Sequence, residues 1–289
     1  TSLADLQNTQ ADTIVDVRAP AEFAEDHIPG AINLPVLDDA ERAKVGTIYT
    51  QISPFKARKI GGALVAQNTA NHLQTALADK DGGWQPLVYC WRGGQRSGSF
   101  TSILQQIGWR ADTVAGGYQA YRRLVYQFLY DTPLPHKIIL LDGNTGTGKT
   151  ALLGLLKAQG MQTIDLEDLA QHRGSLLGER DDPQPAQKAF ETGLAAALVA
   201  CDPARPVVIE AESSKIGRIN LPPSLWSAMC AAPRIMVTAP LTARAAFLAN
   251  IYADMSFDLN DLRAKLQPMR YIRGHTIVDT WEAALGSRD

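Results

Sequence analysis

At residues 143–150 the chain reads Gly143-Asn144-Thr145-Gly146-Thr147-Gly148-Lys149-Thr150, and this stretch decides the fold of its second half. It matches the pattern GxxxxGK[ST] at every position. Glycines let the backbone wrap around a polyphosphate with several N–H groups pointing inward, and Lys149 adds a full positive charge. Thr150 is a candidate Mg²⁺ ligand. We therefore expect all eight residues to form a phosphate- or diphosphate-binding loop (P-loop), although the motif does not specify which phosphate compound binds.

The sequence around this loop predicts a parallel α/β domain. An apolar run at 137–141 precedes the loop as a strand, and the segment that follows it, to about Ala158, favours a helix. Strands that alternate with helices indicate a parallel sheet. Further elements are expected in the same half: strands at 161–165, 206–210 and 234–238, and an alanine-rich helix within 183–200.

Two acids, Glu210 and Glu212, follow the predicted strand at 206–210. An ATPase or kinase needs an acid at the end of a strand to help hold Mg²⁺ beside its P-loop. Both glutamates are candidates for this role. An ordinary solvated strand end explains them equally well from sequence alone.

The first half contains a second reactive segment, Cys90-Trp-Arg-Gly-Gly-Gln-Arg-Ser97, which joins a predicted strand to a predicted helix. Such a turn is where α/β domains present a reactive group. The amides of the loop, the helix N-terminus and the charges of Arg92 and Arg96 favour thiolate over thiol, which lowers the pKa of Cys90. We interpret Cys90, Arg92 and Arg96 as the catalytic residues of an anion-binding loop.

The rest of the first half predicts a domain of its own. Short strands at 12–17, 86–90 and 112–114 and helices at 97–107 and 118–130 again indicate a parallel α/β sheet. Two prolines within 131–136 interrupt the pattern and indicate a linker. We expect a first domain at 1–130, a linker at 131–136 and a second domain at 137–289.

Composition restricts the class of protein further. The 289 residues fit two domains, and 45% hydrophobic with 20% charged residues is typical of a soluble globular protein. No apolar stretch is long enough to span a bilayer, and Thr1–Gln10 lacks the pattern of a secretory signal. A net charge of −2 gives no overall attraction to nucleic acid, so any RNA contact must come from local patches.

The cysteines favour a reducing, cytoplasmic location. Cys90, Cys201 and Cys230 are odd in number and far apart, so they predict neither a disulfide framework nor a structural metal site. Cys201 and Cys230 lack a glycine- and arginine-containing loop. We therefore expect these two to be small buried side chains.

The first ~130 residues contain a set of motifs that resembles a rhodanese domain. Ile14–Phe23 and His27–Pro35 look like the opening of such a domain, and the turn Gly116-Gly117-Tyr118 also fits its pattern. Cys90 lies where the active-site cysteine of rhodaneses belongs. Within these motifs we expect an ion pair between Asp16 and Arg18 that braces the cysteine loop, and a structural role for His27.

The fusion of this loop to a P-loop resembles the tRNA 2-selenouridine synthase family. Residues 165–175 and 209–217 resemble two further segments of that family. The resemblance implies an α/β fold with an N-terminal rhodanese-like domain and a C-terminal P-loop NTPase-like domain. It also implies a set of substrate-contacting or supporting residues: Asp165, Glu167, His172, Arg173, Ser175, Glu210, Glu212, Ser213 and Lys215.

The family's activity implies a two-step transferase reaction on 2-thiouridine at the wobble position of tRNA. A geranyl group from geranyl diphosphate is first placed on the sulfur, and selenophosphate then supplies the selenium that replaces it. The partners implied are tRNA and an enzyme that supplies selenophosphate, with no membrane partner, no tightly bound cofactor and no metal held by the protein alone. Family members continue beyond Asp289, so we expect this chain to lack their last helices.

Basic residues near the C-terminus are candidates for RNA contact. They surround Tyr271, which could stack on a base: Arg263, Lys265, Arg270, Arg273 and His275. A solvated helix face explains this stretch equally well. Lys215 and Arg218, near the expected rim of the P-loop, are further candidates. His172 and Arg173 are better candidates, because they lie in the family-like segment 165–175.

Two other functions remain open at this point. A sulfurtransferase fused to an ATP-dependent kinase would act on a small molecule. A non-catalytic module would use its cysteine loop only to bind oxyanions, and the presence of Cys90 disfavours it. Residues 165–175 and 209–217 disfavour the kinase.

Overall fold

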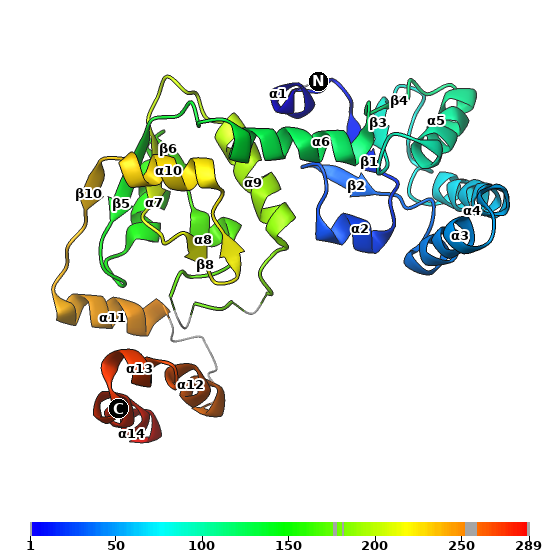
Figure 1. The fold of residues 1–289 in the computed structure, drawn as a ribbon. Helices are drawn as coiled ribbons and strands as arrows, with labels where there is room; N and C mark the ends of the chain where they lie inside the picture. The colour runs from blue at the N-terminus through cyan, green and yellow to red at the C-terminus, as the bar shows by residue number, and fades with distance from the viewer. Residues whose placement is uncertain (1, 176–177, 181, 252–258, 288–289) are drawn as a thin grey trace. The chain divides into compact units, whose positions relative to one another are not determined.

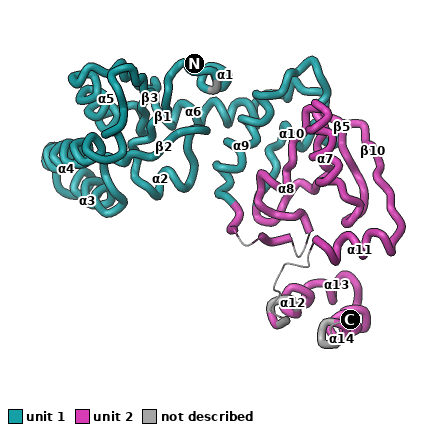
Figure 2. Tube along the Cα trace, turned by 180° about the vertical axis from the view of Figure 1, so that it is seen from behind, with its two compact units in different colours: residues 1–137, 185–206, 219–231 teal, residues 138–184, 207–218, 232–289 magenta. Residues whose placement is uncertain are grey.

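The computed structural model describes residues 2–175, 178–180, 182–251 and 259–287. The chain forms two compact units, one made of 1–137, 185–206 and 219–231, and the other of 138–184, 207–218 and 232–289 (Figures 1 and 2). This division is discontinuous. Helix α9 (Gln187–Val199) and helix α10 (Pro223–Ala231) follow the P-loop in sequence but belong to the first unit. The sequence-based boundaries at 130 and 137 stay a prediction.

The first unit is built on a parallel four-stranded sheet of order β2-β1-β3-β4. Its strands are β1 (Thr13–Asp16), β2 (Ala31–Asn33), β3 (Pro86–Tyr89) and β4 (Asp112–Thr113). Its helices besides α9 and α10 are α1 (Leu3–Gln7), α2 (Pro20–Glu25), α3 (Asp39–Gln51), α4 (Pro54–Gln74), α5 (Gln95–Ile107), α6 (Gly117–Tyr126) and the π-helical turn η1 (Gln127–Asp131). The helix expected over 118–130 is therefore α6 continued by that turn.

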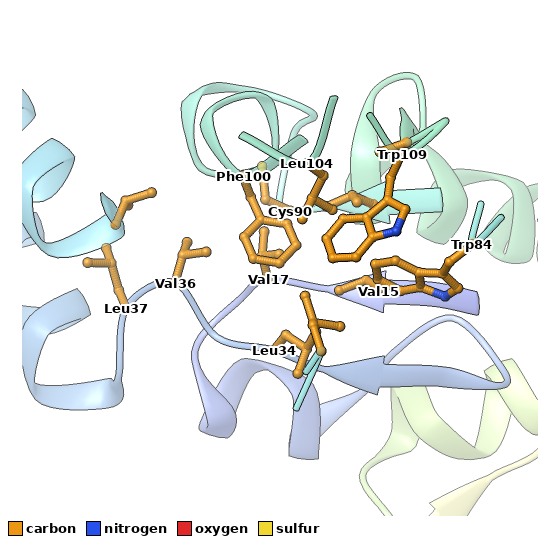
Figure 3. Packing of buried hydrophobic residues seen from close by; sticks show 14 residues of the cluster. Val15, Val17, Leu34, Val36, Leu37, Trp84, Cys90, Phe100, Leu104 and Trp109 are labelled. Carbon is orange, nitrogen blue, oxygen red and sulfur yellow. The ribbon is translucent and has the colours of Figure 1, made fainter. Parts of the chain in front are cut away.

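The core of this unit holds the cysteine loop in place. Val15, Val88, Phe100 and Leu104 are completely buried, and Cys90 packs in the same cluster (Figure 3). Helix α5 packs against α4 and against strands β3 and β4, while α6 packs against α1 and α9. The loop after β3 is thus fixed between the sheet and the start of α5.

The second unit contains a parallel sheet of order β10-β5-β7-β6. Its strands are β5 (Ile138–Asp142), β6 (Gln162–Ile164), β7 (Val207–Glu210), β10 (Arg234–Met236) and the short β8 (Lys215–Ile216), whereas the short strand β9 (Ile219–Asn220) is made of residues of the first unit. Its helices are α7 (Lys149–Ala158), α8 (Leu166–Leu169), α11 (Leu241–Ile251), α12 (Leu259–Leu266), α13 (Met269–Arg273) and α14 (His275–Ser287). Because β5 and β7 are neighbours, the loop after β5 and the acids at the end of β7 meet at one edge.

These observations confirm the predicted fold class of two α/β domains with parallel sheets. Strand β5 leads into the P-loop and α7 begins at Lys149, as the motif requires. None of the described helices is long and apolar enough to cross a membrane.

Candidate functional sites: a cysteine loop and a P-loop cleft

The cysteine loop connects β3 to α5, and the sulfur of Cys90 sits inside it. The side chain is only 3% exposed, so the thiol is more enclosed than an exposed strand-to-helix turn suggests. The hydroxyl of Ser97 donates a hydrogen bond to Sγ of Cys90 at 3.2 Å. Gly94 is the N-cap residue of α5, so the positive end of that helix lies beside the sulfur.

The surroundings of Cys90 favour its thiolate. Burial raises the pKa of this thiol, but hydrogen bonds from Ser97 and from the amides of Ser97 and Gly94, with the charge of Arg96, lower it further than burial raises it. The net result is a pKa below the ordinary value, as the sequence predicted. Ser97, whose role the sequence did not reveal, contributes more than either arginine.

The two arginines of the loop differ in their surroundings. Arg96 forms an ion pair with Glu22 of α2 at 2.7 Å, and this pair is about one-fifth exposed. Part of the Arg96 charge is therefore balanced by a carboxylate. Arg92 is exposed on the loop.

A buried ion pair supports the cysteine loop. Arg18 binds Asp16 at 2.6 Å with both side chains essentially unexposed, which confirms the expected pair. The Arg18 guanidinium lies over the ring of Tyr118 at 3.9 Å from its centroid. Tyr118 is in turn bound to the loop, because its amide donates to the carbonyl of Cys90 at 2.9 Å. His27 stacks on Phe23 with ring centroids 3.8 Å apart, consistent with a structural role.

The P-loop adopts the conformation its glycines allow, and helix α11 covers one side of it. Lys149 Nζ donates to the carbonyl of Gly143 at 2.8 Å, which holds its charge over the loop. Gly146 has a φ of +85°, and a side chain there would collide with Leu248 of α11. Arg244 of the same helix donates to the carbonyl of Thr145 at 2.9 Å.

The acid at the end of β7 lies directly behind the P-loop. Glu210 is completely buried, so the alternative interpretation of this residue as part of an ordinary solvated strand end is wrong. The Thr150 hydroxyl donates to it at 3.5 Å and the amide of Glu167 at 2.8 Å. Burial, together with the charges of Asp165 and Glu167, raises the pKa of Glu210 to about 9.

Two more carboxylates face each other beside the P-loop. Burial and the charges of Glu212 and Asp165 raise the pKa of Glu167 to about 7. Burial also raises the pKa of Glu212, against the attraction of Lys149. A cation or a hydrogen-bond donor on a ligand would relieve this repulsion.

The residues present fit a Mg²⁺ ion that is shared with a bound diphosphate. Magnesium prefers hard oxygen ligands and is usually held by one or two carboxylates together with substrate phosphates. Thr150 and Glu210 offer such oxygens close together. Among the described residues no group of three or more His, Cys, Asp or Glu side chains could hold a metal ion without such help. When bound, the ion would neutralise charge on the phosphates.

These elements enclose a cleft of about 680 Å³, called the P-loop cleft below. Its lining includes most of the P-loop and a wall of three apolar side chains from α11. The lining residues are Gly143, Asn144, Thr145, Gly146, Gly148, Lys149, Thr150, Ala151, Glu167, Arg173, Gly174, Ser175, Arg180, Ala211, Glu212, Ser213, Phe247, Leu248 and Ile251. The sequence did not predict the wall, because α11 carries no motif and lies about a hundred residues from the P-loop.

Five of the predicted site residues in this half lie outside the lining: Thr147 of the P-loop, Glu210 behind it, and Asp165, His172 and Lys215. Asp165 caps α8 by accepting from the amide of Asp168. His172 is buried, and its ring accepts from the amide of Gly174, so it supports the loop that faces the cleft. Lys215 is exposed on β8.

The basic stretch near the C-terminus is partly neutralised. Arg270 pairs with Asp279 and Glu282 at 2.7 Å and 3.1 Å, and Lys265 pairs with Glu179 at 2.6 Å. Tyr271 is 95% exposed. Only part of this stretch therefore presents unbalanced positive charge.

One expectation about the remaining cysteines is wrong. Cys230 is exposed on α10, and Cys201 is partly buried. The apolar side chains of α10 that are buried, Leu225 and Met229, lie on another face of that helix. The sequence around Cys230 gave no signal for which face would point inward.

A cysteine in an anion-binding loop on one parallel sheet, with a P-loop on another, defines a rhodanese-like domain fused to a P-loop domain. Comparison with family models agrees: residues 1–124 match the rhodanese-like domain, and residues 136–269 match the tRNA 2-selenouridine synthase AAA domain. The chain belongs to the tRNA 2-selenouridine synthase family.

Curated relatives extend this match along most of the chain. The tRNA 2-selenouridine synthase of Shewanella denitrificans is 39% identical over 76% of this chain and 60% of its own length. That of Nitrosomonas europaea is 36% identical over 84% of this chain and 64% of its own length. The chain thus spans less than two thirds of these relatives. A solved rhodanese-related protein from Thermoplasma volcanium is 22% identical over 43% of this chain and 89% of its own, with a TM-score of 0.27.

Proposed function

We propose that this chain is the rhodanese-like and P-loop part of an enzyme that converts 2-thiouridine at the wobble position of tRNA into 2-selenouridine. Its substrates are geranyl diphosphate, selenophosphate and the tRNA. The names of the relatives support selenouridine formation in tRNA. The use of geranyl diphosphate and selenophosphate is supported by the chemistry of the two sites.

The observation that carries the proposal is the composition of the P-loop cleft. One side presents the P-loop amides and Lys149, which suit a diphosphate. Helix α11, which packs against the P-loop, presents Phe247, Leu248 and Ile251 to the same cleft, and these side chains suit a hydrocarbon chain. A ligand with a diphosphate head and an apolar tail satisfies both sides.

The first step transfers the prenyl group. The thiocarbonyl sulfur of the base attacks C1 of geranyl diphosphate, forming a carbon–sulfur bond while the carbon–oxygen bond breaks and diphosphate leaves. N3 of the base loses its proton in this step. Lys149 and the P-loop amides stabilise the negative charge that develops on the departing diphosphate. Mg²⁺ beside Thr150 and Glu210 would supply further charge neutralisation there.

The second step replaces sulfur with selenium. Selenium from selenophosphate bonds to C2 of the base, the C2–sulfur bond breaks, and geranyl thiol leaves. Water cleaves the selenium–phosphorus bond and releases phosphate. An alkylated sulfur leaves more readily than a bare thiocarbonyl sulfur, which explains why the prenyl group comes first.

We assign the selenium step to the cysteine loop. Its amides, the start of α5 and Arg96 stabilise an anion at the position of the Cys90 sulfur. Selenophosphate and selenide are both anionic, so the same cradle suits either one. An enzyme that makes selenophosphate is the partner that this step requires.

Binding measurements test the assignment of the P-loop cleft. Burying a CH₂ group contributes about 0.8 kcal/mol, so two buried carbons strengthen binding by more than about tenfold. We expect calorimetry to show geranyl diphosphate binding at least tenfold more tightly than inorganic diphosphate. Phe247→Ala should reduce this ratio. Leu241→Ala is the matched control, because Leu241 lies on the same helix, is 75% exposed and does not line the cleft.

Two results would contradict the assignment. Equal affinity for geranyl diphosphate and inorganic diphosphate would mean that the apolar wall does not bind the chain. Steady ATP hydrolysis without tRNA, abolished by Lys149→Ala, would favour the sulfurtransferase fused to a kinase.

A further inference from the structure

A second cavity, of about 290 Å³, opens in the first unit next to the cysteine loop and takes no part in the steps above. It is called the aromatic pocket below. Its lining combines aromatic rings with cations: Trp91, Tyr118, Gln119, Arg122, Arg123, Tyr126 and Lys188. Six of these residues come from the cysteine loop and α6, and Lys188 comes from α9.

Backbone hydrogen bonds fix the pocket to the cysteine loop. Trp91 follows Cys90 directly in the chain. The amide of Tyr118 donates to the carbonyl of Cys90, and the amide of Gln119 donates to the carbonyl of Trp91, both at 2.9 Å. The first turn of α6 and the reactive loop are therefore one rigid piece, and a ligand in the pocket lies beside that loop.

The aromatic rings of the pocket pack against other rings. Tyr126 is 49% exposed, and its ring is stacked parallel to that of Tyr130 with centroids 4.6 Å apart. Trp91 and Tyr118 pack with centroids 5.4 Å apart. Tyr126 is thus held in place by a neighbour while much of its surface remains open for a further stacked ring.

The cations of the pocket leave an excess of positive charge. Arg122 pairs with Glu191, but its Nη1 is buried and has no hydrogen-bond partner in the described part of the chain. Lys188 pairs with Glu25 at 2.7 Å. Arg123 is exposed, and its side chain forms no ion pair with any residue that the structure describes. Arg123 can therefore still bind an anion.

We propose that the aromatic pocket binds one unpaired nucleotide of the RNA substrate, with its base stacked on Tyr126 and its phosphate bound by Arg123. Single-stranded RNA is recognised by this combination of aromatic stacking and positive charge. The volume suits a single flipped-out nucleotide and not a helix. The inference rests on the proposed function, which makes RNA the substrate.

Placing a nucleotide here would bring the anticodon to Cys90. A nucleotide next to the wobble base, held in the pocket, would leave the wobble base itself within reach of the cysteine loop. The basic stretch at 263–275 could then contribute contacts elsewhere on the tRNA.

Binding to an anticodon stem-loop RNA that carries 2-thiouridine tests the pocket, measured by fluorescence anisotropy on the full chain. Stacking of a base on an aromatic ring is worth about five- to 150-fold in affinity, so Tyr126→Ala should weaken binding at least about fivefold. Tyr126→Phe should bind within about twofold of the unmodified chain. Arg123→Ala should lower the slope of log affinity against log salt concentration by roughly 0.7 to 0.9.

Matched controls separate this pocket from general effects. Phe55 and Lys59 are exposed on α4, away from the pocket, so Phe55→Ala and Lys59→Ala should bind RNA as the unmodified chain does. Stem-loops with an abasic site at the wobble position or at either neighbour test the stacking itself. With one of these RNAs, the effect of Tyr126→Ala should disappear, because the base that stacks is missing.

The outcomes distinguish the pocket from the function on which it rests. If the unmodified chain binds the RNA while Tyr126→Ala and Arg123→Ala bind equally well, the pocket proposal is overturned and the proposed function stands. If the effect of Tyr126→Ala persists with all three abasic RNAs, Tyr126 has a structural role and the proposal is also overturned. If the unmodified chain does not bind the RNA at all, both proposals fail.

Discussion

Replacing Gly117 by alanine should damage the cysteine loop specifically. Gly117 has a φ of +59°, and a Cβ there would overlap the carbonyl oxygen of Cys90 and lie 2.5 Å from the amide nitrogen of Gly93. The left-handed conformation costs an alanine about 1–2 kcal/mol, and shifting packed backbone typically costs a further ~1–3 kcal/mol. We therefore expect Gly117→Ala to lower the free energy of unfolding by about 2–5 kcal/mol.

Gly98→Ala provides the matched control. Gly98 lies within α5, and a Cβ there meets nothing within 4 Å. Alanine in a helix should raise the free energy of unfolding by roughly 0.5–1 kcal/mol relative to glycine. Urea titration of both variants followed by tryptophan fluorescence measures the difference. Equal stability of Gly117→Ala and the unmodified chain would refute the close packing of α6 on the cysteine loop.

Three further predictions concern single side chains. Ser97→Ala should raise the pKa of Cys90, because the sulfur loses its hydrogen bond. Thiolate absorbance measured against pH gives this pKa, and the same pKa in the variant and the unmodified chain would contradict the prediction. Burial raises the pKa of Asp26, so its charged form opposes folding and stability is lost as pH rises from the ordinary value of 3.8 through the raised one. As pH rises across that range, the free energy of unfolding of Asp26→Asn should therefore increase relative to that of the unmodified chain, as measured by urea titration. A difference in free energy of unfolding that does not change with pH would contradict this. Glu210→Gln should fold normally, because Glu210 with a pKa of about 9 is neutral at pH 7 without ligand. The same variant should show a smaller effect of Mg²⁺ on diphosphate binding, measured by calorimetry.

The sequence predicted both reactive loops and the strands that carry them, because local patterns determine these features. Each of these two loops is one continuous stretch of sequence, and its residue types determine its conformation. The strands β1, β3, β5 and β7 were predicted from short apolar runs in a parallel α/β pattern, but their pairing was not. The pairing of Asp16 with Arg18 was also predictable, because the two residues are near each other in sequence.

The features that were not predicted depend on contacts between distant segments. The apolar wall from α11 and the contribution of Lys188 to the aromatic pocket bring together residues far apart in sequence. The packing of α9 in the first unit, although it follows the P-loop, has no local signal either. The exposure of Cys230 depends on which face of α10 packs inward, and a nine-residue helix of mostly apolar side chains does not specify that face.

The most direct test of the proposed two-step reaction is mass spectrometry of nucleosides from 2-thiouridine-containing tRNA after incubation with the chain, geranyl diphosphate and selenophosphate. Cys90→Ala should accumulate the geranylated nucleoside without forming 2-selenouridine, and Lys149→Ala should form neither product. Selenouridine formed without geranyl diphosphate, or by Lys149→Ala, would contradict the assignment of the first step to the P-loop cleft.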